Sequence, residues 1–127
     1  MASIEITEEN FGATIENHPI VILDFWAAWC GPCKNFAPVF EAASARHQDI
    51  VFGKIDTDAE QALAGAFNIR SIPTLMVLRD KIMVYREAGA MTAGSFEQLI
   101  NHIRALDMNE IRAEMLAREE GDPDAPG

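Results

Sequence analysis

Two cysteines, Cys30 and Cys33, are the residues of this sequence that are best suited to carry chemistry. They are the only cysteines in the chain, and Gly31 and Pro32 separate them. An i, i+3 spacing on a helix brings two Cα atoms within the distance of about 7 Å that a disulfide requires. A disulfide that closes so short a loop contributes little stability, because its effect on the unfolded chain grows with loop length. The pair is therefore more typical of a catalytic dithiol or a metal site than of a structural cross-link.

The two cysteines are predicted to have different roles because they lie at different depths of one helix. The apolar run 20–26 predicts a strand, and apolar residues after Cys33 recur at helical spacing, so that Cys30 falls where the helix begins. Free backbone N–H groups and the helix dipole favour a thiolate there. We therefore predict that Cys30 is the nucleophile and that Cys33, one turn deeper and less exposed, is the resolving thiol. Gly31 and Pro32 fit this position, since proline is favoured in a first helical turn and glycine permits close approach of another chain.

Asp24 is the candidate general base, and in the reverse direction the general acid, for this exchange. It is the one carboxylate in the apolar run 20–26, where burial disfavours the charged form and raises its pKa. A raised pKa suits a group that accepts a proton from a thiol. Lys54, on the predicted neighbouring strand, is placed to pair with Asp24, and the two groups would then titrate jointly. Judged from its local sequence alone, Asp24 fits equally well as a salt-bridged or edge-exposed carboxylate without a role in proton transfer.

The elements that position these residues alternate between strands and helices. In order, we expect a short strand at 4–6, a helix at 8–17 capped by Thr7, strands at 20–26 and 50–55 on either side of the helix after Cys33, a helix at 60–67, strands at 74–79 and 82–87, and a helix from Ser95 to 106. The run 20–26 is typical of a central strand covered on both faces. Only Asp80 and Lys81 separate the last two strands, which must therefore be antiparallel. Ser95 and Gln98 have the spacing of a capping box.

Residues 24–34, with the sequence DFWAAWCGPCK, resemble the active-site segment of the thioredoxin family. Residues 69–74, IRSIPT, similarly resemble the family segment that carries a cis-proline, here Pro73, beside the dithiol. Gly89-Ala90 matches the family's glycine on the substrate-facing rim. The resemblance covers about residues 4–106. It implies an α/β protein with the thioredoxin fold, a central mixed β-sheet flanked by helices.

The same resemblance implies where substrates bind and which partners act. Substrate peptides would lie across Trp29, Ile72, Pro73 and Gly89, next to the Gly31-Pro32 pair already described. Partners would be substrate proteins that contain disulfides and an NADPH-dependent flavoprotein, thioredoxin reductase. No bound cofactor is implied, because the Cys30–Cys33 disulfide is itself the redox group. Two departures from the family pattern are Ser71, where the family often has glycine, and Asp80-Lys81, which replaces an Asn-Gly turn.

Length and charge narrow the function further. The chain has 127 residues, enough for one domain with a substantial core, and a formal net charge of −10. This charge works against binding to nucleic acid or to an anionic membrane. The N-terminal sequence lacks the basic start and apolar run of a signal peptide, and no apolar run reaches the roughly 20 residues of a membrane span. We therefore expect a cytoplasmic protein without a membrane anchor, and a monomer.

The last 21 residues differ from the rest of the chain. Residues 107–127 carry seven acidic and two basic side chains, and so contribute −5 to the net charge. We therefore divide the chain into a thioredoxin domain, 1–106, and an acidic C-terminal extension, 107–127. A mobile tail is the default expectation, with 121–127 disordered. The alternative is a short helix whose apolar ridge is formed by Ile111, Met115 and Leu116.

Three other functions fit parts of the sequence. An oxidase or isomerase of the same fold would need a more oxidising couple and usually an exported location. A binding module would use the acidic extension and leave the dithiol incidental. A zinc site normally takes four cysteine or histidine ligands, and His18, His47 and His102 lack ligand-like spacing, so such a site would need a second molecule. A protein-disulfide reductase is the function we predict.

Overall fold

A five-stranded mixed sheet forms the centre of the computed structural model, which describes residues 3–121. Its strands are β1 (Ser3–Glu5), β2 (Ile20–Trp26), β3 (Val51–Asp56), β4 (Thr74–Arg79) and β5 (Ile82–Ala88). The spatial order is β1-β3-β2-β4-β5, in which β3 is parallel to β1 and β2, while β4 is antiparallel to both β2 and β5. The apolar strand β2 is therefore central, as its sequence predicted.

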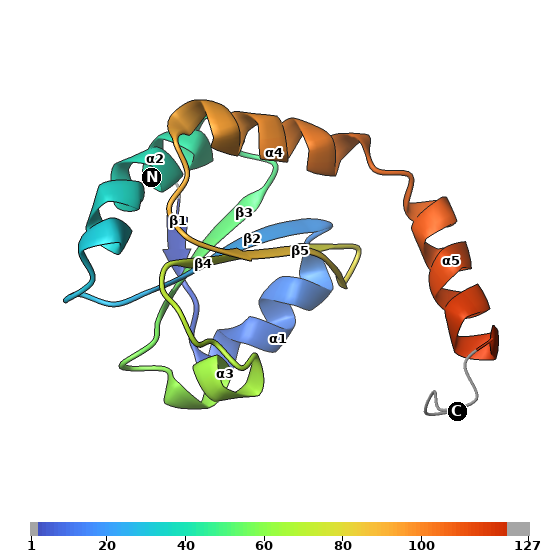
Figure 1. Ribbon diagram of the computed structural model, residues 1–127, viewed down its shortest axis with the longest axis horizontal. Helices are drawn as coiled ribbons and strands as arrows, with labels where there is room; N and C mark the ends of the chain where they lie inside the picture. The colour runs from blue at the N-terminus through green and yellow to red at the C-terminus, as the bar shows by residue number, and fades with distance from the viewer. Residues whose placement is uncertain (1–2, 122–127) are drawn as a thin grey trace.

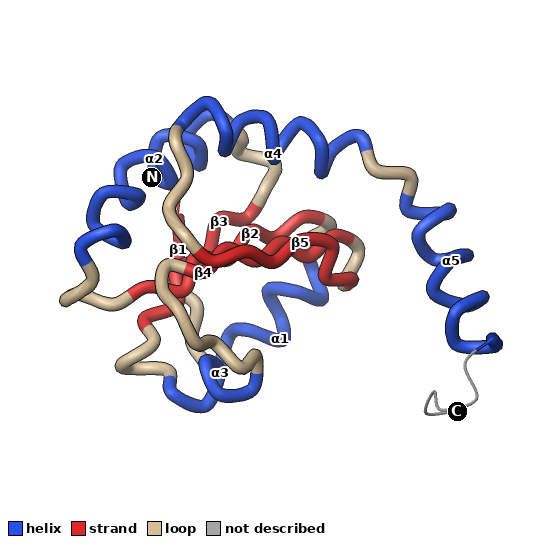
Figure 2. Tube along the Cα trace, in the orientation of Figure 1, coloured by secondary structure: helices blue, strands red, loops and turns tan. Residues whose placement is uncertain are grey.

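Helices cover both faces of this sheet (Figure 1). They are α1 (Glu8–Asn17), α2 (Gly31–Arg46), α3 (Gln61–Ala66) and α4 (Ala93–Ala105). Helices α2 and α4 lie on one side, and α1 and α3 lie on the other; Figure 2 shows the strands as a single layer between them. This arrangement confirms the predicted mixed sheet flanked by helices. Within residues 3–121, no helix is long and apolar enough to span a bilayer.

Alternating residues of β2 supply two separate cores. Ile20 and Ile22 pack with residues of α2 and α4, whereas Val21, Leu23 and Phe25 belong to the core on the α1 and α3 side. Four phenylalanines, each at most 1% exposed, build the first core: Phe36, Phe40, Phe52 and Phe96. Their ring centroids lie 5.3 to 6.2 Å apart. This packing fixes α2 against the sheet and so positions the cysteines at its first turn.

The capping box predicted at Ser95 and Gln98 is wrong. Helix α4 begins at Ala93, and its N-cap is Thr92, whose hydroxyl accepts a hydrogen bond from the backbone N–H of Ser95 at 3.1 Å. Ser95 is thus the third residue of the helix. The threonine takes the capping position because its backbone is extended (φ −71°, ψ 161°), which leaves its side chain free to reach the first turn.

The C-terminal extension contains a further helix, α5 (Met108–Gly121). The short helix that we gave as the alternative is thus present over this range. Met108 is buried, with 5% of its surface exposed, and the Arg112 guanidinium lies 3.3 Å from the Asp80 carboxylate in the β4–β5 turn. The disorder expected for 121–127 concerns residues 122–127, which lie outside the described part of the chain.

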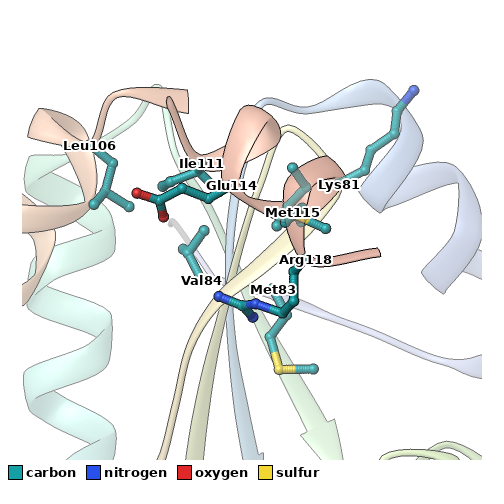
Figure 3. Close-up of a pocket in the computed structure, with 9 residues that line it drawn as sticks. Lys81, Met83, Val84, Leu106, Ile111, Glu114, Met115 and Arg118 are labelled. Carbon is teal, nitrogen blue, oxygen red and sulfur yellow. The ribbon is translucent and has the colours of Figure 1, made fainter. Parts of the chain in front are cut away.

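Helix α5 and the first half of β5 face each other across a groove of about 520 Å³ (Figure 3). Ile111 is half-buried there, but Met115 and Leu116 of the predicted ridge are 40% and 59% exposed. The connection from α4 to α5 is held by Arg79 of β4. Its Nη1 donates to the carbonyl oxygens of Ile103 at 2.6 Å and Leu106 at 2.9 Å. The helix is therefore attached mainly at its N-terminal end.

Candidate active site

A disulfide joins Cys30 and Cys33 at the start of α2, directly after β2. Their Cα atoms are 5.3 Å apart, within the range that needs no backbone movement. Cys30 is the N-cap of α2, and its Sγ accepts a hydrogen bond from the backbone N–H of Cys33 at 3.2 Å. The predicted helix start is thus confirmed. In the reduced protein the same N–H and the helix dipole would stabilise a thiolate on Cys30.

The two cysteines differ less in exposure than the sequence suggested. Cys30 is 4% exposed and Cys33 is 3% exposed. Both are enclosed by one small cluster that contains Ala27 and, partly buried, Trp26 and Ile72. Burial therefore does not distinguish the nucleophile from the resolving thiol; the distinction that the geometry does make is the N-cap position of Cys30.

A loop that precedes β4 lies against the disulfide. The Ile72–Pro73 peptide bond is cis, as the family resemblance implied, and the Ile72 carbonyl oxygen is 3.7 Å from the Sγ of Cys30. Gly89 has a φ of 111°, a conformation that favours glycine, and its N–H donates to the Pro73 carbonyl at 2.8 Å. The structure thus brings Ile72, Pro73 and Gly89 together beside Cys30.

The surface around the disulfide is formed by exposed residues on either side of the cysteines. Gly31 and Pro32 are exposed, and Trp29, at 70%, is the most exposed large hydrophobic side chain among the described residues. The indole Nε1 of Trp29 donates to the Asp58 carboxylate at 3.0 Å. Asp58 was not predicted from the sequence, because nothing in its neighbourhood indicates a partner 29 residues away. The hydrogen bond holds the indole ring in one orientation next to Cys30.

Asp24 is buried on the face of β2 that α2 covers. Only 1% of its surface is exposed, and neither carboxylate oxygen has a hydrogen-bond partner among the described residues. Burial raises its pKa from 3.8 to about 7, while the Lys54 ammonium acts in the opposite direction. The buried Nε1 of Trp26, two residues along on the same face, also lacks a protein partner in residues 3–121. Asp24 is therefore buried, as we expected. Its carboxylate and the Trp26 Nε1 are polar groups without hydrogen-bond partners among the described residues.

Lys54 lies directly across from Asp24 in the register between β2 and β3. The expected pairing is electrostatic rather than a direct contact, since none of the ion pairs within residues 3–121 joins these two side chains. The Lys54 ammonium instead lies 5.0 Å from the centre of the Trp26 ring. Trp26, which was expected to be a core residue, is partly buried and packs against the cluster that contains Cys30 and Cys33.

Over the described range, no group of three or more histidine, cysteine, aspartate or glutamate side chains is placed to hold a metal ion.

Comparison with known proteins identifies the family. The sequence profile named Thioredoxin matches residues 2–103. The chain belongs to the thioredoxin family. A relative from Streptomyces coelicolor that is named as a thioredoxin is 47% identical over 111 residues, covering 87% of this chain and 83% of the relative. The thioredoxin of Bacillus subtilis is 39% identical over 102 residues, covering 80% of this chain and 97% of the relative. In structure, a thioredoxin variant from Halobacterium salinarum superposes with a TM-score of 0.77 at 30% identity, covering 84% of this chain and 94% of that one.

Family membership gives the dithiol its chemistry. Thioredoxins are protein-disulfide oxidoreductases, and this thioredoxin has its disulfide at the C-x-x-C position of the family. Its activity is thiol–disulfide exchange, in which Cys30 and Cys33 cycle between dithiol and disulfide. Thioredoxins need no cofactor for this reaction, because the redox-active disulfide is part of the protein.

Proposed function

We propose that this thioredoxin reduces protein disulfides with Cys30 as nucleophile, Cys33 as resolving thiol and Asp24 as general base. The Cys30 thiolate attacks one sulfur of the substrate disulfide, which breaks that bond, forms a mixed disulfide and releases the first substrate thiol after it takes a proton. Asp24 then accepts the proton of Cys33, whose thiolate attacks the Sγ of Cys30 and releases the second substrate thiol. Two electrons pass to the substrate, and the Cys30–Cys33 disulfide remains.

The observation that carries this assignment is the position of Cys30 at the N-cap of α2. Its sulfur receives the Cys33 N–H at 3.2 Å and lies beside the Ile72 carbonyl at 3.7 Å. A thiolate at Cys30 is favoured by the helix N-terminus, whereas Cys33 lies within the helix and depends on a base. Asp24 supports the role of base because its pKa of about 7 allows it to be ionised or protonated near neutral pH. Lys54 acts on this pKa through its charge.

Substrate peptides are proposed to lie across Trp29, Ile72, Pro73 and Gly89. In support, Trp29 precedes Cys30 in the chain, Ile72 packs against the cysteine cluster, and Gly89 donates to the carbonyl of Pro73. The exposed Gly31 and Pro32 leave room for an approaching chain. The electrons are proposed to come from NADPH through a flavoprotein thioredoxin reductase, the partner that the family implies. We also propose a cytoplasmic location, because a reductase works in a compartment that keeps thiols reduced. A monomeric state is part of the same proposal. Residues 1–106 are proposed to carry the activity without the extension.

A trapping experiment tests the roles of the two cysteines. Cys33→Ser leaves the attacking thiol but removes the resolving one, so that it should hold substrate proteins as mixed disulfides that dithiothreitol releases. The matched control, Cys30→Ser, should hold none, and both variants should lose turnover. Capture by Cys30→Ser instead of Cys33→Ser would reverse the two roles. The reduction potential of the wild-type couple separates a reductase from an oxidase, since the oxidase requires a potential well above the glutathione poise.

A further inference from the structure

A second, polar cavity lies next to the loop that carries Ile72 and Pro73. Its volume is about 300 Å³, and it is lined by Asn68, Arg70, Ser71 and Thr74 from the loop side and by 86–88 from β5. We call it the arginine cavity. It adjoins the proposed substrate surface at two points, since Ser71 precedes Ile72 and Ala88 precedes Gly89. The Gly89 N–H donates to the Pro73 carbonyl, which connects the two sides of this rim.

Two arginines supply this cavity with N–H groups that make no hydrogen bond to the described residues. Arg70 and Arg86 are both exposed. Arg86 donates through Nη2 to the Asn68 carbonyl at 3.0 Å, which holds its guanidinium at the cavity and leaves its other N–H groups available. No hydrogen bond or ion pair found within residues 3–121 uses the Arg70 guanidinium. The Ser71 hydroxyl is also exposed, whereas the Thr74 hydroxyl already donates to the Ser71 carbonyl at 2.5 Å.

One carboxylate, Glu87, also lines the cavity and would oppose an anion there. The sheet register turns its side chain away from Arg86. Arg86 lies opposite Met76, which belongs to the core on the α1 and α3 side, whereas Glu87 lies opposite Leu75, which belongs to the core on the α2 and α4 side. The two side chains therefore point to opposite faces of the sheet, so that the Glu87 carboxylate does not pair with the Arg86 guanidinium.

We propose that the arginine cavity binds an acidic side chain of the substrate protein, located a few residues from the cysteine that Cys30 attacks. This inference rests on the proposed substrate surface. The whole chain has a net charge of −10 and repels acidic partners at long range, so that two arginines lining one cavity next to the proposed substrate surface provide a local site where one carboxylate is favoured. A planar guanidinium is suited to this task because it binds a carboxylate through two parallel N–H groups.

Model peptides test the proposal directly. Each peptide contains one disulfide. The peptides come in pairs that differ at one position, within three residues of the reactive cysteine on either side, where one peptide has glutamate and the other has glutamine. The second-order rate of reduction is measured for each pair at low ionic strength. For at least one position, wild-type protein should reduce the glutamate peptide about 3- to 10-fold faster than the glutamine peptide, the range expected for one or two exposed ion pairs. Raising the salt concentration should diminish this ratio.

Variants locate the preference. Arg70→Gln and Arg86→Gln should each lower the glutamate-to-glutamine ratio, and the double variant should bring it to about 1. Arg70→Glu should favour a lysine peptide over the glutamate peptide. The matched control is Arg118→Gln, because Arg118 is an exposed arginine on α5, far along the chain from this loop. The glutamate-to-glutamine ratio of this variant should equal that of the wild type.

The possible results separate the two proposals. If wild-type protein reduces both peptides of every pair at the same rate, the arginine cavity does not select acidic substrates, although the reductase function stands. If the ratio persists in the double variant, another region of the surface causes it and the assignment to this cavity is overturned. If no peptide disulfide is reduced, the proposed function itself fails.

Discussion

Polar groups beneath the disulfide and polar groups at the base of helix α5 have contrasting environments. Asp24 and Trp26 place buried polar atoms where the described residues offer no hydrogen-bond partner. At α5, by contrast, Arg79 donates to carbonyl oxygens at the end of α4, and Arg112 contacts both Asp80 and Asn109. Satisfied and mostly exposed contacts of the second kind add modest stability, whereas an unpartnered buried carboxylate lowers it.

The contrast indicates which region is adapted to chemistry and which to attachment. Folded proteins usually provide partners for buried polar groups, and exceptions occur at functional sites. A carboxylate that is destabilised when ionised can exchange protons near neutral pH, which a fully paired carboxylate cannot do. Substitutions in the first region should therefore have larger effects than substitutions in the second.

Asp24→Asn should stabilise the oxidised protein at neutral and alkaline pH. The pKa of Asp24 is about 7 in the folded protein, against 3.8 for the unperturbed group, so wild type loses stability as pH rises from 4 to 7 and is level above that range. Three pKa units correspond to about 4 kcal/mol. Urea unfolding at a series of pH values should show the variant gaining this amount relative to wild type between pH 4 and pH 8. An unchanged difference across that range would contradict the raised pKa.

Lys54→Met tests, by the same urea unfolding series, how far the Lys54 charge lowers the pKa of Asp24. Removal of the cation that lowers the pKa of Asp24 should move the midpoint of the stability curve to higher pH. A midpoint that does not move would show that the Lys54 charge is screened from Asp24.

The rate of the resolving step should fall in Asp24→Asn by about a hundredfold, since positioned proton transfer typically contributes at least that factor. The loss should be largest above pH 7, where the wild-type carboxylate is ionised and able to accept the proton of Cys33. Below pH 6 the two proteins should converge. Stopped-flow fluorescence of Trp29 during reduction of a peptide disulfide measures this step, and a pH-independent loss would argue for a structural role.

Arg79→Met should lower the free energy of unfolding by about 2 kcal/mol, because it leaves the carbonyls of Ile103 and Leu106 without their charged donor. The measurement is urea unfolding at pH 7. Turnover at Cys30 should be unchanged, because Arg79 is at the far end of β4 from Thr74 and the cis peptide bond. An equal loss of turnover would show that the two regions are coupled.

Arg112→Gln should have the smallest effect, below about 1 kcal/mol, as is usual for an exposed ion pair. Its consequence should be local, with faster amide hydrogen exchange in α5 and no change in β2. The matched control is Arg118→Gln on the same helix, which leaves the contact to Asp80 in place. If the amides of α5 remain protected from exchange in Arg112→Gln, the helix is attached through Met108 instead.

Much of this fold could be predicted because its signals are local. The strand at 20–26 and the helix at 8–17 follow from runs of apolar residues and from Thr7, and the structure has the same limits. The signals that predict the cysteine pair and its position at the start of a helix likewise lie within a few residues of each other. The family resemblance then supplied the cis peptide bond at Pro73, which the local sequence could not.

The unpredicted features depend on contacts between residues far apart in the chain. Asp58 meets Trp29, and Arg79 reaches the end of α4, only because the fold brings them together. The start of α4 was misplaced because Thr92 and Ser95 are both good capping residues, and the backbone conformation before the helix decides between them. The anchor of α5, Met108, was overlooked because one apolar residue at the head of a polar stretch has no periodic signal.

The placement of α5 bears on how this protein behaves when it is concentrated. Strand β5 is an outer strand of the sheet, and the unpaired backbone groups of an open edge can recruit a strand from another molecule. Helix α5 stands beside Ile82–Val84, and the exposed charges of Arg86 and Glu87 follow along the strand. Because α5 lies beside the first half of this edge, we expect a protein that ends at residue 106 to leave the edge more open and to aggregate at concentrations that the full chain tolerates.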